Sequence, residues 1–266
     1  MLIKLLKYDL KWTIKNIDIF LGLGLFFGIV GRILELSFDS LFFDVVIGIC
    51  KGAGLSLTIS ALVNAIIRSW VRLTINLYKD EAYLSNTLPI KRSVHLLSKC
   101  LNAIICVLIV MIVLVINLFI MYYSKETLEW LKSSLNILSS TFDTSVVGFF
   151  IIMIGVVLLE VLFIIGCGYF GIIFGHIHNY NKGFYSFLYG FISYLACTLF
   201  TVILLMIGTV FNEGLHTIIF MENLVSTIDF SLIRGIMIFA FVVYAVYVGI
   251  LYVVCNYKFK KGINID

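Results

Sequence analysis

The sequence has little proline and little charge. Pro89 is its one proline in 266 residues, and only 13% of the residues are charged. Charged residues make up about a quarter of an ordinary soluble domain. Here 62% of the chain is apolar. Because a soluble protein of this size could not bury so much apolar surface, we expect much of it to face lipid.

Several catalytic and metal-binding motifs are also missing. The sequence has no Walker-type phosphate loop, no G-x-S-x-G, no H-E-x-x-H and no C-x-x-C. His176 and His178 form an H-x-H without a third ligand nearby. We therefore expect no catalytic residue, no metal site and no cofactor in this chain, and a net charge of +4 indicates no nucleic-acid partner. The scattered cysteines are interpreted as small apolar residues: Cys50, Cys100, Cys106, Cys167, Cys197 and Cys255.

Six apolar stretches are long enough to cross a membrane, which takes about 20 helical residues. They cover about 19–36, 45–67, 96–122, 146–174, 187–211 and 233–252. We predict an all-α polytopic membrane protein, with residues 1–266 forming one transmembrane domain of six helices. Residues 1–16 are predicted to form an amphipathic helix in the membrane interface, because Lys4, Lys7, Lys11 and Lys15 share one face.

Lysine and arginine are distributed unevenly among the connections. Most lie in the N-terminal segment, in the connections after the second and fourth spans, and in the C-terminal tail, whereas the other side holds only Lys125 and Lys132. Basic connections face the cytoplasm. We therefore predict a multi-pass protein of the cell membrane with both termini in the cytoplasm, as an even number of spans also requires.

Two further patterns concern how the chain packs. Residues 212–231 lie on the outer side and are too apolar for a free loop, so they are expected to form short re-entrant helices or an amphipathic surface helix. Three G-x-x-x-G pairs predict close approach between helices: Gly24 and Gly28, Gly48 and Gly52, and Gly171 and Gly175.

Four polar residues within the predicted spans are candidates for function, because ionisable groups are costly in a membrane. They are Arg32, Lys51, Asn64 and Glu160. Glu160 lies near the centre of its span and could gate a path, contact a substrate or carry a proton. It could instead pair with Lys51, Arg32 or Asn64 for structural reasons. Arg32 and Glu35 are spaced to pair with each other.

The connection between the second and third predicted spans is the most informative segment. It is predicted to contain a short amphipathic helix, within residues 80–93, that Pro89 stops. The segment begins with acidic residues and ends with basic ones, on the predicted cytoplasmic side. We interpret it as a handle for a partner protein, with these contact residues: Asp80, Glu81, Tyr83, Leu84, Leu88, Pro89, Lys91 and Arg92.

Residues 79–89, KDEAYLSNTLP, resemble the D-E-x-Y-L…L-P segment of permease subunits of ABC transporters of the type-2 (exporter) class. Lys99 matches the lysine that opens the third span in that family. The amphipathic N-terminal helix and the sequence GHIHNYNK at 175–182 are similar to further family features. The chain departs from members that carry a fused ATPase.

The resemblance implies a division of labour. Two permease copies, or two homologous permeases, would pair in the membrane, and separate cytoplasmic ATPase subunits would bind ATP and Mg²⁺. Residues 80–93 would be the coupling helix that docks on the ATPase, with Leu84 and Leu88 as its apolar anchor. The substrate exported or extracted would be hydrophobic or amphipathic, such as a peptide, an antimicrobial or a drug-like molecule.

Two other functions stay open at this point. One is a membrane module that does not transport, such as a sensor, a scaffold or an immunity protein. The other is a secondary transporter that uses Glu160 for protons, which predicts an internal inverted repeat.

Overall fold

In the computed structural model the described residues are 1–38, 40–79, 81–87, 89–141, 145–211, 215–216 and 230–261. Within them the elements are helices, with bounds α1 Leu2–Ser37, α2 Leu41–Tyr78, α3 Ala82–Thr87, α4 Arg92–Tyr122, α5 Lys125–Thr141, α6 Val146–Gly175, α7 Lys182–Phe211 and α9 Phe230–Lys261. Six helices of this described part are long and apolar enough to cross a membrane. The prediction of an all-α polytopic protein is confirmed.

The chain divides into two compact units. The first unit comprises Met1–Glu129 together with the end of α9 from Lys258, and the second comprises Trp130–Tyr257. The sequence analysis treats residues 1–266 as one transmembrane domain. In the structure the first three long helices pack around one core and the last three around another.

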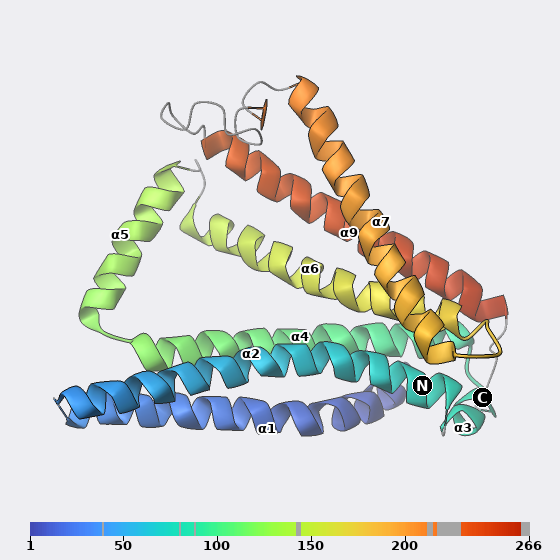
Figure 1. The fold of residues 1–266 in the computed structure, drawn as a ribbon, viewed down its shortest axis with the longest axis horizontal. Coiled ribbons are helices and arrows are strands. Elements are labelled where there is room, and N and C mark those ends of the chain that lie inside the picture. Colours follow the sequence, from blue (N-terminus) through green and yellow to red (C-terminus); the bar gives the residue numbers. More distant parts are fainter. Residues whose placement is uncertain are drawn as a thin grey trace. The chain divides into compact units, whose positions relative to one another are not determined.

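In the first unit α1, α2 and α4 lie side by side, with α3 at one end (Figure 1). Their shared core consists of Ile17, Leu21, Ala61, Ala65, Cys106 and Val110. The backbones of α1 and α2 approach closely at Gly24, where an added Cβ would lie 3.2 Å from the Gly54 carbonyl oxygen. The pair Gly24 and Gly28 therefore acts as predicted, as a site of close helix approach.

Helix α1 runs without a break through both the predicted interfacial helix 1–16 and the predicted span 19–36. No proline or glycine stands between Asn16 and Ile19 to separate them. Residues 1–16 and the predicted span 19–36 therefore belong to one continuous helix. The buried face also differs from the apolar face expected in the first turns, because Asp9 and Thr13 are buried while Ile3 is 81% exposed.

Helix α5 is an element that the sequence analysis leaves in a connection. It has too few apolar residues for a span, and it begins where Ser124 Oγ accepts a hydrogen bond from the backbone N–H of Thr127 at 2.9 Å. A serine at this place, with Glu126 in the first turn, is a typical helix start. That signal was available in the sequence.

In the second unit α6 packs on both α7 and α9. A Cβ on Gly171 would lie 2.3 Å from the Ser186 carbonyl oxygen, so the third glycine pair also marks a close helix contact. The contact of α6 with α9 is built from larger side chains: Phe163, Cys167, Val243, Tyr247 and Leu251. By contrast, a Cβ on Gly48 or Gly52 would meet no atom within 4 Å in the described part of the chain.

Most of the predicted re-entrant segment 212–231 lies outside the described residues. The long helices extend past the predicted apolar stretches, since α2 covers Leu41–Tyr78 where the prediction gives 45–67. The added turns carry Asp9 of α1 and Arg72 of α2, which belong to the candidate site described below.

Candidate functional site

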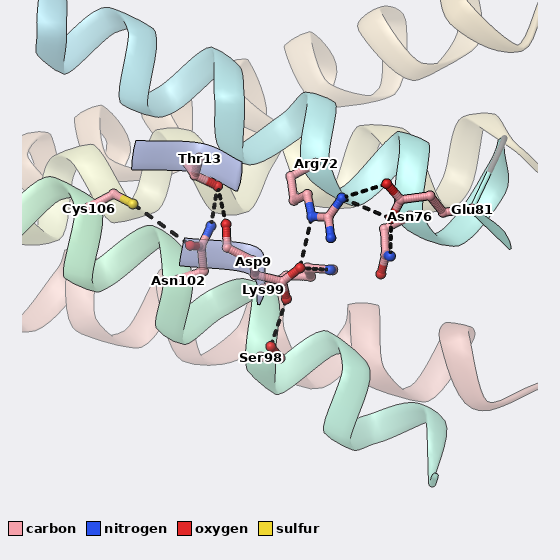
Figure 2. Close-up of polar contacts among 9 residues, drawn as sticks. All are labelled: Asp9, Thr13, Arg72, Asn76, Glu81, Ser98, Lys99, Asn102 and Cys106. Carbon is pink, nitrogen blue, oxygen red and sulfur yellow. Dashed lines mark hydrogen bonds and ion pairs between the residues drawn. The ribbon is translucent and has the colours of Figure 1, made fainter. Parts of the chain in front are cut away.

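The carboxylate of Asp9 on α1 lies at the meeting point of three helices. Its side chain is 3% exposed. It accepts hydrogen bonds from Arg72 Nε of α2 at 2.8 Å, and from Ser98 Oγ and Lys99 Nζ of α4 at 2.8 and 2.5 Å. Figure 2 shows these donors converging on Asp9. One carboxylate therefore holds α1, α2 and α4 together.

Arg72 extends this arrangement to the segment before α3. Its NH1 group donates to both carboxylate oxygens of Glu81, at 3.0 and 2.9 Å. Asn76 Nδ2 donates to the same carboxylate at 2.8 Å. The Arg72 guanidinium also lies over the Trp12 ring, 5.3 Å from its centroid. Arg72 thus bridges a carboxylate of α1 and a carboxylate at the start of α3.

A second branch runs deeper along the bundle. Thr13 Oγ1 donates to the backbone oxygen of Asp9 at 2.9 Å and accepts from Asn102 Nδ2 at 3.0 Å. Cys106 Sγ lies 3.8 Å from Asn102 Oδ1. These side chains are buried between α1 and α4, so polar contacts continue the register that Asp9 sets.

The charges of this network balance, with the carboxylates of Asp9 and Glu81 facing the cations of Arg72 and Lys99. A buried ion pair adds little net stability because desolvation offsets attraction, but removal of one partner costs about 3–5 kcal/mol. The network therefore determines which helix positions can be adjacent more than it increases overall stability.

Glu81 lies outside the predicted spans and is held ionised. Partial burial acts to raise its pKa, but the hydrogen bond from Asn76 and the charge of Arg72 outweigh burial, and the pKa lies below its ordinary value of 4.5. At neutral pH the bridge from Glu81 to Arg72 is therefore a full ion pair.

Helix α3 has one face toward the first unit and one toward solvent. Ala82 and Ser85 are buried, whereas Tyr83 and Leu84 are 68% and 74% exposed. Glu81, which belongs to the polar network, directly precedes α3. Tyr83 and Leu84 lie on the exposed face of that helix. Exposed basic residues flank α3 in the chain, with Lys79 before it and Lys91 and Arg92 after it. The outer face of α3 is therefore a small apolar patch with a basic rim.

A second ion cluster lies at the opposite end of the first unit. Glu35 accepts from Arg32 and, at 2.8 Å, from Lys51 Nζ. Arg32 also donates to the backbone oxygen of Tyr123. At about 1.5 Å per residue, Asp9 and Arg32 are about 35 Å apart along α1. This separation is close to the roughly 30 Å thickness of a bilayer core.

The residues predicted from the sequence are therefore distributed among several places. The i, i+3 pairing of Arg32 with Glu35 is confirmed, and Lys51 pairs with the same carboxylate. Glu160 is exposed on α6, and Asn64 donates to the backbone oxygen of Ser60 at 3.1 Å.

The predicted coupling segment 80–93 is divided between two helices. It contains α3, which ends at Thr87, and Arg92 already belongs to α4. Pro89 and Lys91 lie between them and are exposed, and Arg92 NH1 donates to the backbone oxygen of Lys260 at 3.3 Å. The predicted contacts Asp80 and Leu88 lie outside the described residues.

Sequence reasoning missed the centre of the site. Arg72 was used only to orient the chain and Asp9 was not considered. The available signal was helical spacing of polar residues within apolar segments: Asp9 and Thr13, Arg72 and Asn76, and Ser98 and Asn102 are each four residues apart. Such spacing places them on one helix face.

The two histidines of the H-x-H have protein partners. His176 Nδ1 lies 2.8 Å from the Ile172 carbonyl oxygen, and His178 shares a hydrogen bond with the Tyr189 hydroxyl at 3.1 Å. Within the described residues no group of three histidine, cysteine, aspartate or glutamate side chains could hold a metal ion.

Comparison with known proteins gives no relative for this chain, since no family model, curated protein or solved structure matches it.

Proposed function

We propose that this chain is the membrane-spanning subunit of an ATP-driven transporter of the ABC exporter class, and that α3 is its coupling helix. One observation carries the proposal: α3 exposes Tyr83 and Leu84 on its outer face, while Glu81 behind it is bonded to Arg72 and through Arg72 to Asp9. The resemblance of residues 79–89 to the family's segment supports the same assignment.

The physical argument concerns how a force on α3 would travel. A partner that grips Tyr83 and Leu84 pulls on a six-residue helix. That helix is joined by ion pairs to α1, α2 and α4, each of which is long enough to cross the membrane. Motion of the partner would therefore move three spans together, as a shift of a packed element.

The same geometry indicates the kind of partner. An exposed apolar pair at the centre of a contact supplies most of the binding energy, and surrounding charges set orientation and association rate. The rim of Lys79, Lys91 and Arg92 is basic, so a cleft with an apolar floor and acidic edges would fit. On the positive-inside argument, this end of the chain faces the cytoplasm, where an ATPase would bind.

Co-purification of a cytoplasmic ATPase tests the proposal. Affinity-tagged full-length protein is purified from its native membranes in mild detergent, and ATP hydrolysis and bound proteins are measured. We expect an ABC ATPase in the wild-type preparation, and at least a tenfold lower yield for the double variant Tyr83→Asp and Leu84→Asp. The control Tyr180→Asp alters another tyrosine that is 84% exposed and should keep the ATPase.

Equal recovery with the double variant would overturn the role of α3. Absence of any ATPase from the wild-type preparation would favour a sensor, scaffold or immunity protein. Circular dichroism of each purified variant establishes that the fold is intact.

A further inference from the structure

Glu160 on α6 is an ionisable side chain far from either end of its helix. It lies halfway along Val146–Gly175, about 20 Å from both ends at about 1.5 Å per residue. Its side chain is exposed, and it makes no hydrogen bond or ion pair with any described residue of the second unit. A charge at this depth is costly unless it faces a partner or a ligand.

The central parts of α6, α7 and α9 contain no basic residue that could act as a counter-ion, since Lys182 and Arg234 lie near helix ends. Residues 146–175, 183–211 and 235–257 contain no lysine or arginine, and Glu160 is the only charged residue among them. Aspartate is absent from these ranges as well. The three spans therefore present a single negative charge inside an apolar unit.

An aromatic cluster begins one helical turn beyond this carboxylate. The ring of Phe163 has centroid distances of 5.8 Å to Tyr194 of α7, and of 5.6 Å to both Tyr244 and Tyr247 of α9. Phe163 is 2% exposed and forms the base of the cluster, whereas Tyr194 is 42% exposed. Tyr244 is half-buried and close enough to Glu160 and to Tyr194 to interact electrostatically with both.

Tyr247 has a structural role in this cluster. The Tyr247 hydroxyl donates to the Cys197 carbonyl oxygen at 3.1 Å and lies 3.0 Å from Thr201 Oγ1, which fixes this ring between α7 and α9. Tyr194 is exposed and Tyr244 half-buried, and the exposed Glu160 lies one helical turn from Phe163, which contacts both rings. One carboxylate and two tyrosine rings therefore lie around Phe163, where α6, α7 and α9 meet.

We infer that Glu160, Tyr194 and Tyr244 form a binding site for a lipophilic organic cation. A cation over an aromatic face is attracted by the ring quadrupole, and more strongly where water is excluded. A delocalised phosphonium, or an aromatic ammonium, loses little hydration on entering a membrane and gains the carboxylate as counter-ion. A lipid headgroup carries its charge at the interface, about 20 Å from Glu160 at a rise of about 1.5 Å per residue.

This inference rests on the proposed transport function and specifies its substrate class. It selects positively charged amphiphiles from the wider set of hydrophobic peptides, antimicrobials and drugs. It also gives Glu160 a role in ligand contact, as distinct from proton carriage.

Equilibrium binding of two isosteric ions tests the site. Full-length protein in nanodiscs, without ATP and without an ATPase, is titrated with tetraphenylphosphonium and with tetraphenylborate, and binding to empty nanodiscs is subtracted. These ions share size and shape and differ in the sign of charge. We expect saturable binding of the phosphonium alone, and an affinity at least tenfold lower for Glu160→Gln.

Two further variants test the rings. Tyr244→Leu should weaken phosphonium binding several-fold, while Tyr244→Phe keeps the π-face and should restore it. Glu126→Gln, which removes an exposed carboxylate from α5, is the matched control and should bind like the wild type. Thermal unfolding of each variant establishes that the affinity was measured on folded protein.

Three outcomes would overturn the inference: equal phosphonium affinity in Glu160→Gln, equal binding of the borate by the wild type, or identical losses in the Leu and Phe variants of Tyr244. The first would return Glu160 to a proton-carrying or structural role. Because the measurement uses neither ATP nor α3, these outcomes leave the docking proposal untouched, and failure of α3 to hold an ATPase leaves the binding result intact.

Discussion

Asp9 has polar partners on both other long helices of the first unit, at the end of the unit that holds α3. Its carboxylate has donors on α2 and α4 while its own backbone oxygen binds Thr13. A neutral side chain at this position would leave Arg72 and Lys99 facing each other without a shared anion. The cost of such a change is dominated by the unpaired charges, not by the lost hydrogen bonds.

We therefore predict that Asp9→Asn lowers the free energy of unfolding by about 3–5 kcal/mol. The matched control is Asp18→Asn, an exposed aspartate of the same helix, which should change it by less than about 0.5 kcal/mol. Denaturant unfolding in mixed micelles measures both. A second change, Lys99→Met, removes one of the stranded cations, so the double variant should be more stable than Asp9→Asn alone. Equal stability of the two aspartate variants would contradict the buried network.

Glu81 should make the anchoring of α3 depend on pH. Its pKa is lowered in the fold, so its stabilising contribution is present above the ordinary value and is lost as the pH falls through the folded value. Below that pH Glu81 is protonated and Arg72 loses one of its two anions. Hydrogen exchange of the α3 amides, measured from pH 7 down to about 3.5, should show faster opening at the acidic end.

In the variant Glu81→Gln, α3 should open more readily at neutral pH and should show a smaller acceleration with acid. The acceleration that remains reports other carboxylates. If this variant showed the same pH profile as the wild type, protonation of Glu81 would not be the cause of the acid-induced opening of α3.

Two of the three glycine pairs lie where neighbouring helices pack closely. Gly24 and Gly171 face backbone atoms of a neighbouring helix, whereas Gly48 and Gly52 face open space in the described part of the chain. The same sequence motif therefore has different structural consequences, and the neighbouring helix decides which one applies.

Alanine substitutions separate the two cases. Gly171→Ala places a methyl group against the Ser186 carbonyl oxygen and the Gly190 amide nitrogen, at 2.3 and 2.7 Å, where backbone must move. We expect a loss of about 1–3 kcal/mol. Gly52→Ala meets no atom and should be neutral or stabilising by up to about 1 kcal/mol, since alanine favours a helix. Thermal unfolding ranks the variants, and the reverse order would refute the contact between α6 and α7.

The elements also mark how far the sequence could predict the structure. Long apolar runs identify spans because a membrane requires about 20 such residues, and all six were found. Helix α5 was missed because it has no such run, although Ser124 and Glu126 signal its start. The division of the chain into a unit of residues 1–129 and a unit of residues 130–257 was not predicted. It depends on which helices pack together, and an apolar helix face does not indicate which other helix it will contact.

The candidate site was predicted only at its surface. Tyr83 and Leu84 were named because an amphipathic segment stands beside Pro89. The network behind them was missed because its members are spread over residues 9 to 102, and each alone resembles an ordinary interfacial charge. Their union depends on the close packing of α1, α2 and α4.

For the whole molecule, we predict that the two ion clusters of the first unit lie near the two surfaces of the bilayer. The Asp9 cluster lies at the end that also holds α3 and the exposed Lys4, Lys7, Lys11 and Lys15. The Glu35 cluster lies at the other end. The positive-inside rule predicts that the lysine-rich end faces the cytoplasm.

Cysteine labelling tests this assignment in a variant without the native cysteines. A membrane-impermeant maleimide added outside intact cells should label Leu36→Cys, which is 72% exposed in the structure. It should label Lys91→Cys only after the membrane is opened. Ile29→Cys, 44% exposed but within the apolar layer, should resist the reagent in both conditions. External labelling at position 91 would reverse the orientation and refute a cytoplasmic partner at α3.

The contacts of Asp9 also constrain the order of biosynthesis. Its partners stand 63, 89 and 90 positions later in the chain. When the ribosome has made α1 alone, this carboxylate has none of them, and it gains the last only after the start of α4 has emerged. We therefore expect the first turns of α1 to stay hydrated in the nascent chain until α4 has been synthesised. Fragments that end before α4 should be recognised as incompletely folded by membrane quality control.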